Sequence, residues 1–167
     1  LGAFSWIIIE WIRFGKPSLV GMATGMAAGL ATITPASCFV GVQGASIPGQ
    51  LGRVLCYSAV DLIRIKIKID DSLDVFAVHG VGGILGTILC SVLMHSGFDG
   101  VGLDEGVTVT RQLKIQIYAV FVTTLWTIFF SYFILKIISI FIDLRVTEDK
   151  EIQGLDNSLH GETGYNN

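Results

Sequence analysis

Apolar residues gather into five stretches along the chain, and short polar connections separate them. A helix that crosses a bilayer needs about 20 predominantly apolar residues. The first stretch is too short to span alone and is interpreted as the tail of a longer helix, whereas the other four reach about that length. The pattern therefore predicts an all-α membrane protein, a polytopic helix bundle over residues 1–142. The stretches cover residues 1–12, 19–42, 45–63, 74–94 and 113–142.

The fifth stretch is longer than a bilayer requires. We therefore expect this helix to tilt or to extend its last turns into water. From Asp143 onward the chain is polar, so residues 143–167 are predicted to form a soluble tail.

Lys and Arg alternate from one connection to the next. The connection 40–44 is uncharged and 95–106 carries Asp and Glu but no Lys or Arg, whereas the connections 13–18 and 64–72 and the start of the tail carry Lys and Arg. Because basic residues accumulate on the cytoplasmic side, this alternation predicts a cytoplasmic tail. The basic residues that follow the rule are Arg13, Lys16, Arg64, Lys66, Lys68, Arg145 and Lys150, and the exceptions are Arg111 and Lys114.

Composition narrows the class of protein further. Charged residues make up 15% of the chain and hydrophobic residues 51%, whereas soluble domains carry about 25% charged residues. The chain has no basic stripe with interleaved aromatic residues, which argues against nucleic-acid binding. Cys38, Cys56 and Cys90 lie too far apart for a metal motif, so no metal or cofactor is expected. No catalytic motif is present, so the chain is not predicted to be an enzyme.

His79 is the residue that most needs explanation. Between Val75 and Met94 the only other ionisable group is Cys90. At membrane depth an imidazole must face protein or a water path, and such residues usually mark a pathway. Val75, His79 and the neighbouring glycines share one helix face, which predicts a neutral histidine that lines an apolar passage. The alternative is a structural histidine bonded to a backbone carbonyl of a neighbouring helix.

Other features of the stretches predict structural roles. Asp74 stands in the first turn of its helix, where it is expected to cap free N–H groups with help from Asp70 and Asp71. Thr34-Pro35 predicts a kink in the second stretch. Small residues four positions apart favour close approach of helices in lipid. They are Gly21, Gly25 and Gly29 in the second stretch and Gly82 and Gly86 in the fourth.

Short motifs of Gly, Pro, His and Asp are spread along nearly the whole chain. They are Gly15–Ser18, Gly25 with Ala31–Ala36, Asp74–Gly83, Leu144–Val146, Gly154–Asp156 and His160–Glu162. In this order they resemble the Amt/Mep ammonium transporters, and the patterns DVFxVHGVGG and GLDxxxHGE are very specific. The chain is similar to the C-terminal part of a bacterial member.

The resemblance implies the last four to five helices of an eleven-helix, homotrimeric channel in the plasma (inner) membrane. It implies that ammonium gives up its proton and that nitrogen passes as ammonia along two neighbouring pore histidines. His79 matches the second of these histidines, Val75 matches the pore wall, and Asp74 matches a structural position below the pore.

The tail resembles the segment that meets the signalling protein PII. The positions that match are Arg145, Gly154, Leu155, Asp156, His160 and Glu162. Pro48, Gln50 and Arg53 depart from the small and aliphatic residues usual in the family, and Cys38 stands where glycine is expected. These departures suit an alternative function, a transport-inactive relative that acts as an ammonium sensor or as a PII-docking partner.

Overall fold

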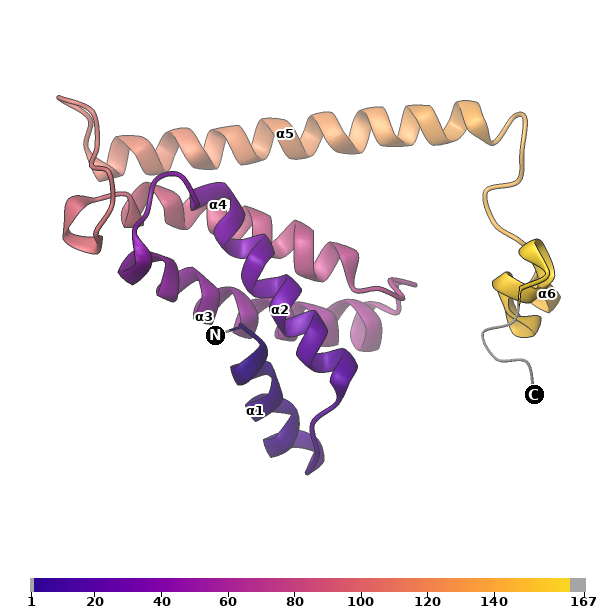
Figure 1. Cartoon of the computed structure of the whole chain (residues 1–167). Coiled ribbons are helices and arrows are strands. Elements are labelled where there is room, and N and C mark those ends of the chain that lie inside the picture. Colours follow the sequence, from indigo (N-terminus) through magenta and orange to yellow (C-terminus); the bar gives the residue numbers. More distant parts are fainter. Residues whose placement is uncertain (1, 163–167) are drawn as a thin grey trace. The chain divides into compact units, whose positions relative to one another are not determined.

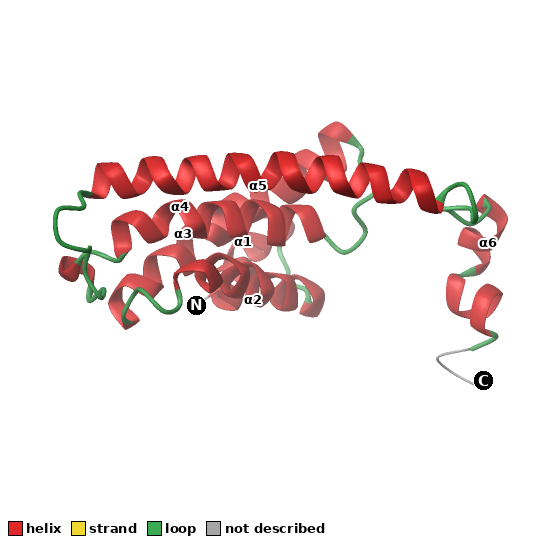
Figure 2. Ribbon diagram, turned by 90° about the horizontal axis from the view of Figure 1, so that it is seen from above, coloured by secondary structure: helices red, strands yellow, loops and turns green. Residues whose placement is uncertain are grey.

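The computed structural model describes residues 2–162 (Figures 1 and 2). Leu1, where the first predicted stretch begins, and residues 163–167, where the predicted tail ends, lie outside the described residues. Residues 2–162 form helices and contain no strand, which confirms the predicted all-α class. The α-helices are α1 (Gly2–Phe14), α2 (Leu19–Ile33), α3 (Val42–Val60), α4 (Val81–Leu93), α5 (Val109–Ile138) and α6 (Glu148–Gln153).

Shorter helical segments extend or separate these α-helices. A π-helical segment, Asp61–Ile67, continues directly from α3, and another, Phe76–Gly80, leads directly into α4. A third, Asp156–His160, lies in the tail. The 3-10 turns are Thr34–Ala36 and Ser96–Phe98.

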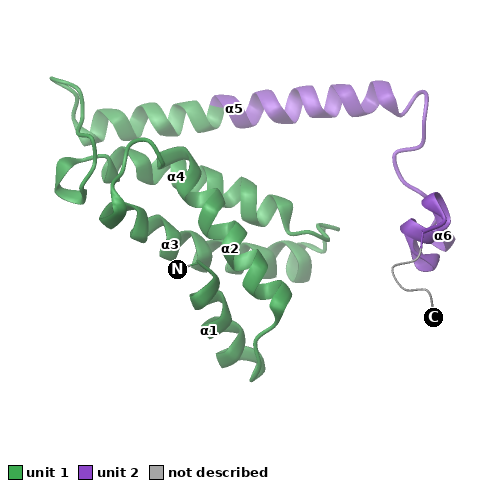
Figure 3. Ribbon diagram, viewed as in Figure 1, with its two compact units in different colours: residues 1–121 green, residues 122–167 purple. Residues whose placement is uncertain are grey.

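The chain forms two compact units, residues 1–121 and 122–167, and the boundary falls within α5 (Figure 3). In the first unit, α2 contacts α1, α3 and α4, and the core lies where these helices meet. The ring of Trp6 from α1 packs edge-on against Tyr57 from α3, with 5.0 Å between the ring centroids. The core cluster consists of Trp6, Ala28, Cys56, Tyr57 and Val78.

Small residues mark where the helices touch. A Cβ atom added at Gly25 would lie 2.5 Å from the Cβ atom of Trp6, and one added at Gly86 would collide with the carbonyl oxygen of Thr32. The glycines four positions apart therefore lie where α1 and α4 pack against α2. Since lipid gives helices no hydrophobic reason to associate, such close backbone contact contributes to helix association in a membrane through van der Waals packing.

Several helix ends differ from the predicted stretches because of local backbone chemistry. Pro35 has no N–H to continue the ladder, so α2 ends at Ile33 and the chain passes through a 3-10 turn, whereas the second stretch was predicted to reach residue 42. The Thr108 hydroxyl accepts a hydrogen bond from the Arg111 N–H at 3.2 Å, so α5 begins at Val109 rather than at the predicted residue 113.

Three described segments are long and apolar enough to cross a membrane: Leu19–Ala36, Phe76–Leu93 and Val109–Ile138. Helix α3 is not among them, and it carries Gln50 and the buried Arg53. It nevertheless packs against α2 and α4, so its place in the first unit rests on contacts rather than on apolarity.

The second unit contains the last part of α5, α6 and the π-helical turn Asp156–His160. None of its residues up to Glu162 is buried. Its local order comes from short-range hydrogen bonds, such as the one from the Ser158 N–H to the Gly154 carbonyl at 3.0 Å.

Candidate functional site

His79 lies in the π-helical segment Phe76–Gly80, which precedes α4. Ala77 and Val78 point into the packed unit and are buried, whereas His79 and Val75 are exposed. A π-helical turn inserts an extra residue into a helix, and such turns are frequent at functional sites. The segment thus separates an inward face, which anchors it, from an outward face, which carries the imidazole.

The outward face borders a pocket of about 440 Å³. Four of its side chains are apolar, and the polar ones are the imidazole and two carboxylates. Val75 and His79 both line this pocket, whereas Asp74 is not among the lining residues. The lining residues are Ile63, Ile69, Asp70, Asp71, Val75, Phe76, His79 and Gly80.

Asp71, not Asp74, caps the helix that carries His79. The Asp71 carboxylate accepts hydrogen bonds from the N–H groups of Val75 at 2.8 Å and Phe76 at 3.0 Å. Asp74 instead has a left-handed backbone with φ of 55°, and its carboxylate lies 3.5 Å from the Arg64 guanidinium. The prediction that Asp74 provides the cap was wrong, because the turn brings the carboxylate of Asp71 to the first free N–H groups.

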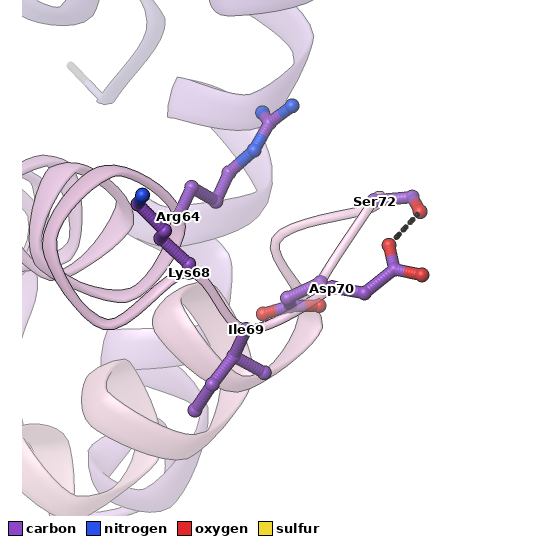
Figure 4. Close-up of a pocket in the computed structure, with 6 residues that line it drawn as sticks. Arg64, Lys68, Ile69, Asp70 and Ser72 are labelled. Carbon is purple, nitrogen blue, oxygen red and sulfur yellow. Dashed lines mark hydrogen bonds between the residues drawn. The ribbon is translucent and has the colours of Figure 1, made fainter.

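A second, polar pocket of about 290 Å³ lies beside this cap (Figure 4). Arg64 and Lys68 come from the end of the π-helical segment after α3, and Asp70 and Ser72 come from the following loop. The Ser72 hydroxyl donates to the Asp70 carboxylate at 3.1 Å, as the dashed line in Figure 4 marks. Charges of both signs therefore meet where the connection between α3 and α4 turns.

The thiol of Cys56 approaches the same segment from its buried side. Its Sγ atom lies 3.7 Å from the carbonyl oxygen of Val78, the residue before His79. The sequence excluded Cys56 from a metal motif, and nothing in the spacing of the cysteines indicated this contact.

The predicted tail residues belong to the second unit. Arg145 holds the Glu151 carboxylate with two hydrogen bonds of 2.6 and 3.0 Å, and these bonds lower the pKa of Glu151. Gly154 and Gly161 have φ of 93° and 65°, which glycine adopts without strain. They flank the π-helical turn that contains Asp156 and His160, and Leu155 and Glu162 lie exposed beside it.

Comparison with known proteins decides the family. The model of the Ammonium Transporter Family matches residues 1–165. The chain belongs to this family. It is 41% identical over 165 residues to an ammonium transporter of Aquifex aeolicus, a match that covers 98% of this chain and 38% of the relative. It is 40% identical over 167 residues to the ammonium transporter Amt1 of Archaeoglobus fulgidus, covering 99% of this chain and 41% of the relative.

Solved structures of the same family share the fold. The chain matches a Mep2 mutant from Candida albicans with a TM-score of 0.76 and 28% identity, over 99% of this chain and 39% of the other. It matches Mep2 from Saccharomyces cerevisiae with a TM-score of 0.72 and 29% identity, over 89% of this chain and 35% of the other.

The chain thus spans about two fifths of the length of these ammonium transporters. Family membership together with the three long apolar segments identifies it as an integral membrane protein. Both of these relatives are named as ammonium transporters.

Proposed function

We propose that the chain forms part of a pathway for ammonium or ammonia across the membrane, with His79 and Val75 on its wall. The observation that supports this proposal is the exposed imidazole at an apolar pocket, at the start of a segment long enough to span a bilayer. The relatives named as ammonium transporters supply the substrate.

The four apolar side chains around His79 suit a neutral, small solute, and the Asp70 and Asp71 carboxylates line another part of the same pocket. A cation at the bilayer centre costs roughly 2.5 kcal/mol or more, whereas ammonia carries no charge. An apolar passage excludes hydrated ions, and a neutral imidazole can accept or donate one hydrogen bond without a permanent charge. By the family resemblance, His79 would act with a second, neighbouring pore histidine that is not among the residues of this chain.

The proposal is tested by replacing His79 with alanine in the intact transporter. We expect methylammonium uptake to be abolished while the assembly stays intact by size-exclusion chromatography. His95→Ala is the matched control, because this exposed histidine accepts a hydrogen bond only from the Gly97 N–H of its own loop. Uptake by His79→Ala at the wild-type rate would exclude the pore role.

We further propose a homotrimer in the plasma (inner) membrane, with the tail in the cytoplasm as the docking segment for a PII-type signalling protein. The alternating basic connections support this orientation. The support for docking is the compact turn Asp156–His160, which presents exposed polar side chains next to the Arg145–Glu151 pair. Ending the chain after Asp143 should abolish PII capture in a pull-down, whereas His79→Ala should bind PII normally; capture by the shortened protein would refute docking.

A second candidate is a transport-inactive relative that senses ammonium or docks PII. Pro48 inside α3 and Arg53, only 8% exposed in the same helix, favour it, since a buried cation within a membrane bundle is costly. The uptake assay separates the two candidates. A sensor would bind PII in an ammonium-dependent manner but give no methylammonium uptake even as wild type.

A further inference from the structure

Cys56 on α3 contacts the backbone that carries His79. Its thiol donates to the Val78 carbonyl, with 3.7 Å between sulfur and oxygen. Both residues are buried, Cys56 with 0% and Val78 with 2% of its surface exposed. The Val78 carbonyl and the His79 N–H belong to one planar peptide unit. A contact that holds this oxygen therefore also fixes the orientation of the peptide plane that ends at the His79 Cα atom.

This peptide lies in a π-helical turn, whose hydrogen bonds are less regular than those of an α-helix. The Val81 N–H is shared between the carbonyls of Phe76 and Val78. A buried carbonyl that receives only a shared N–H is stabilised by an additional hydrogen-bond donor, because buried backbone groups are costly when incompletely bonded. The Cys56 thiol supplies that donor from a different helix.

The surroundings leave Cys56 little freedom to move. Thr32, also 0% exposed, donates from Oγ1 to the Ala28 carbonyl at 2.8 Å, which fixes its side chain on α2. A Cβ atom added at Gly82 would lie 3.0 Å from Thr32 Oγ1 and 3.3 Å from Cys56 Sγ. The thiol therefore sits where α2, α3 and α4 meet, beside Gly82, which is three residues along the chain from His79.

We propose that Cys56 is a positioning residue for His79: its thiol holds the Val78–His79 peptide and so directs the imidazole toward the pocket. This inference rests on the proposed pathway at His79. A thiol is a weak donor, so the effect is modest and acts on the geometry of the histidine rather than on the existence of the fold.

The test compares Cys56→Ala, Cys56→Ser and Cys90→Ala in the intact transporter. Cys90 is the matched control because it is also a buried cysteine, 3% exposed, but lies on α4 about 16 Å along the helix axis beyond His79. Two readouts are taken: the KM and maximal rate of methylammonium uptake per folded transporter, and amide hydrogen exchange of the peptide covering residues 76–83.

Cys56→Ala should lower the maximal rate about three- to tenfold, the equivalent of one lost hydrogen bond, with little change in KM. It should also speed exchange in residues 76–83. Cys56→Ser keeps a donor and should restore most of both properties, whereas Cys90→Ala should change neither.

The outcomes distinguish a failure of the positioning role of Cys56 from a failure of the proposed transport function. If the wild type is active but Cys56→Ala and Cys90→Ala behave alike in both readouts, the positioning role is overturned. The positioning role is also overturned if Cys56→Ala lowers the uptake rate only as much as it lowers the amount of folded transporter and Cys56→Ser does not restore the rate. A wild type without uptake overturns the proposed function instead, and hydrogen exchange then decides whether Cys56 holds the segment.

Discussion

The two apolar helices α4 and α5 differ in how they are stabilised. Both lie in segments long enough to cross a membrane, yet Gly82, Gly86 and Cys90 of α4 are buried, whereas none of residues 109–138 of α5 is. Helix α5 has no glycine and carries large aromatic side chains instead, such as Trp126 and Phe130, whose ring centroids are 4.2 Å apart. The small residues of α4 thus allow the close approach of neighbouring helices, whereas α5 carries large side chains along its length.

The same contrast holds for the two units. The first unit has a core in which four helices meet, and it contains the histidine site. The second unit, up to Glu162, has no buried residue, and it is held by turns and by surface contacts such as the Arg145–Glu151 ion pair. Substitutions should therefore have large effects at helix contacts of the first unit, intermediate effects at its edge, and small effects in the second unit.

The largest effect is expected at the contact between α4 and α2. Gly86→Ala places a methyl group against the Thr32 carbonyl oxygen, which belongs to the backbone and cannot turn away. Overpacking of this kind costs about 1–3 kcal/mol, so the thermal unfolding midpoint of the intact transporter should fall.

Gly83→Ala is the control on the same helix. A Cβ atom at Gly83 meets nothing within 4 Å, so this substitution should change stability by no more than about 0.5 kcal/mol. Equal midpoints for the two variants would show that small residues do not explain why α4 is packed.

How far the sequence predicts these features depends on how local each signal is. The apolar stretches and His79 could be found because hydropathy and an isolated ionisable group are visible within a few residues. The ends of α2 and α5 were missed by several residues, although Pro35 and the capping Thr108 carry the signal.

The pocket beside His79, by contrast, could not be predicted from local sequence. Ile63 and Ile69 reach it from the connection after α3, and Cys56 reaches the other side of the segment from α3 itself. These contacts and the Asp71 cap surround the π-helical turn that carries His79. Because such contacts join residues far apart in sequence, the hydrophobic pattern does not predict them.

An intermediate effect is expected at Asp71, at the edge of the packed unit. Asp71→Ala removes the cap from the Val75 and Phe76 N–H groups and should cost about 1 kcal/mol. Amide exchange in residues 75–80 should become faster, and methylammonium uptake should fall because the histidine segment loosens. Ser72→Ala removes a hydroxyl that donates to Asp70 in the same turn but does not line the His79 pocket, so it should leave both properties near wild type; equal changes in the two variants would argue against the cap.

The smallest effect is expected in the second unit, where pH probes the Arg145–Glu151 pair. Since hydrogen bonds from Arg145 lower the pKa of Glu151, the pair contributes local stability above the ordinary glutamate pKa of about 4.3. That contribution is lost as the pH falls through the lowered value and the carboxylate is protonated. Exchange of amides in residues 145–153, corrected for its intrinsic pH dependence, should therefore rise slightly below that pH in the wild type. Glu151→Gln should show no such step, and an identical rise in this variant would mean that the pair adds nothing, as is common for exposed ion pairs.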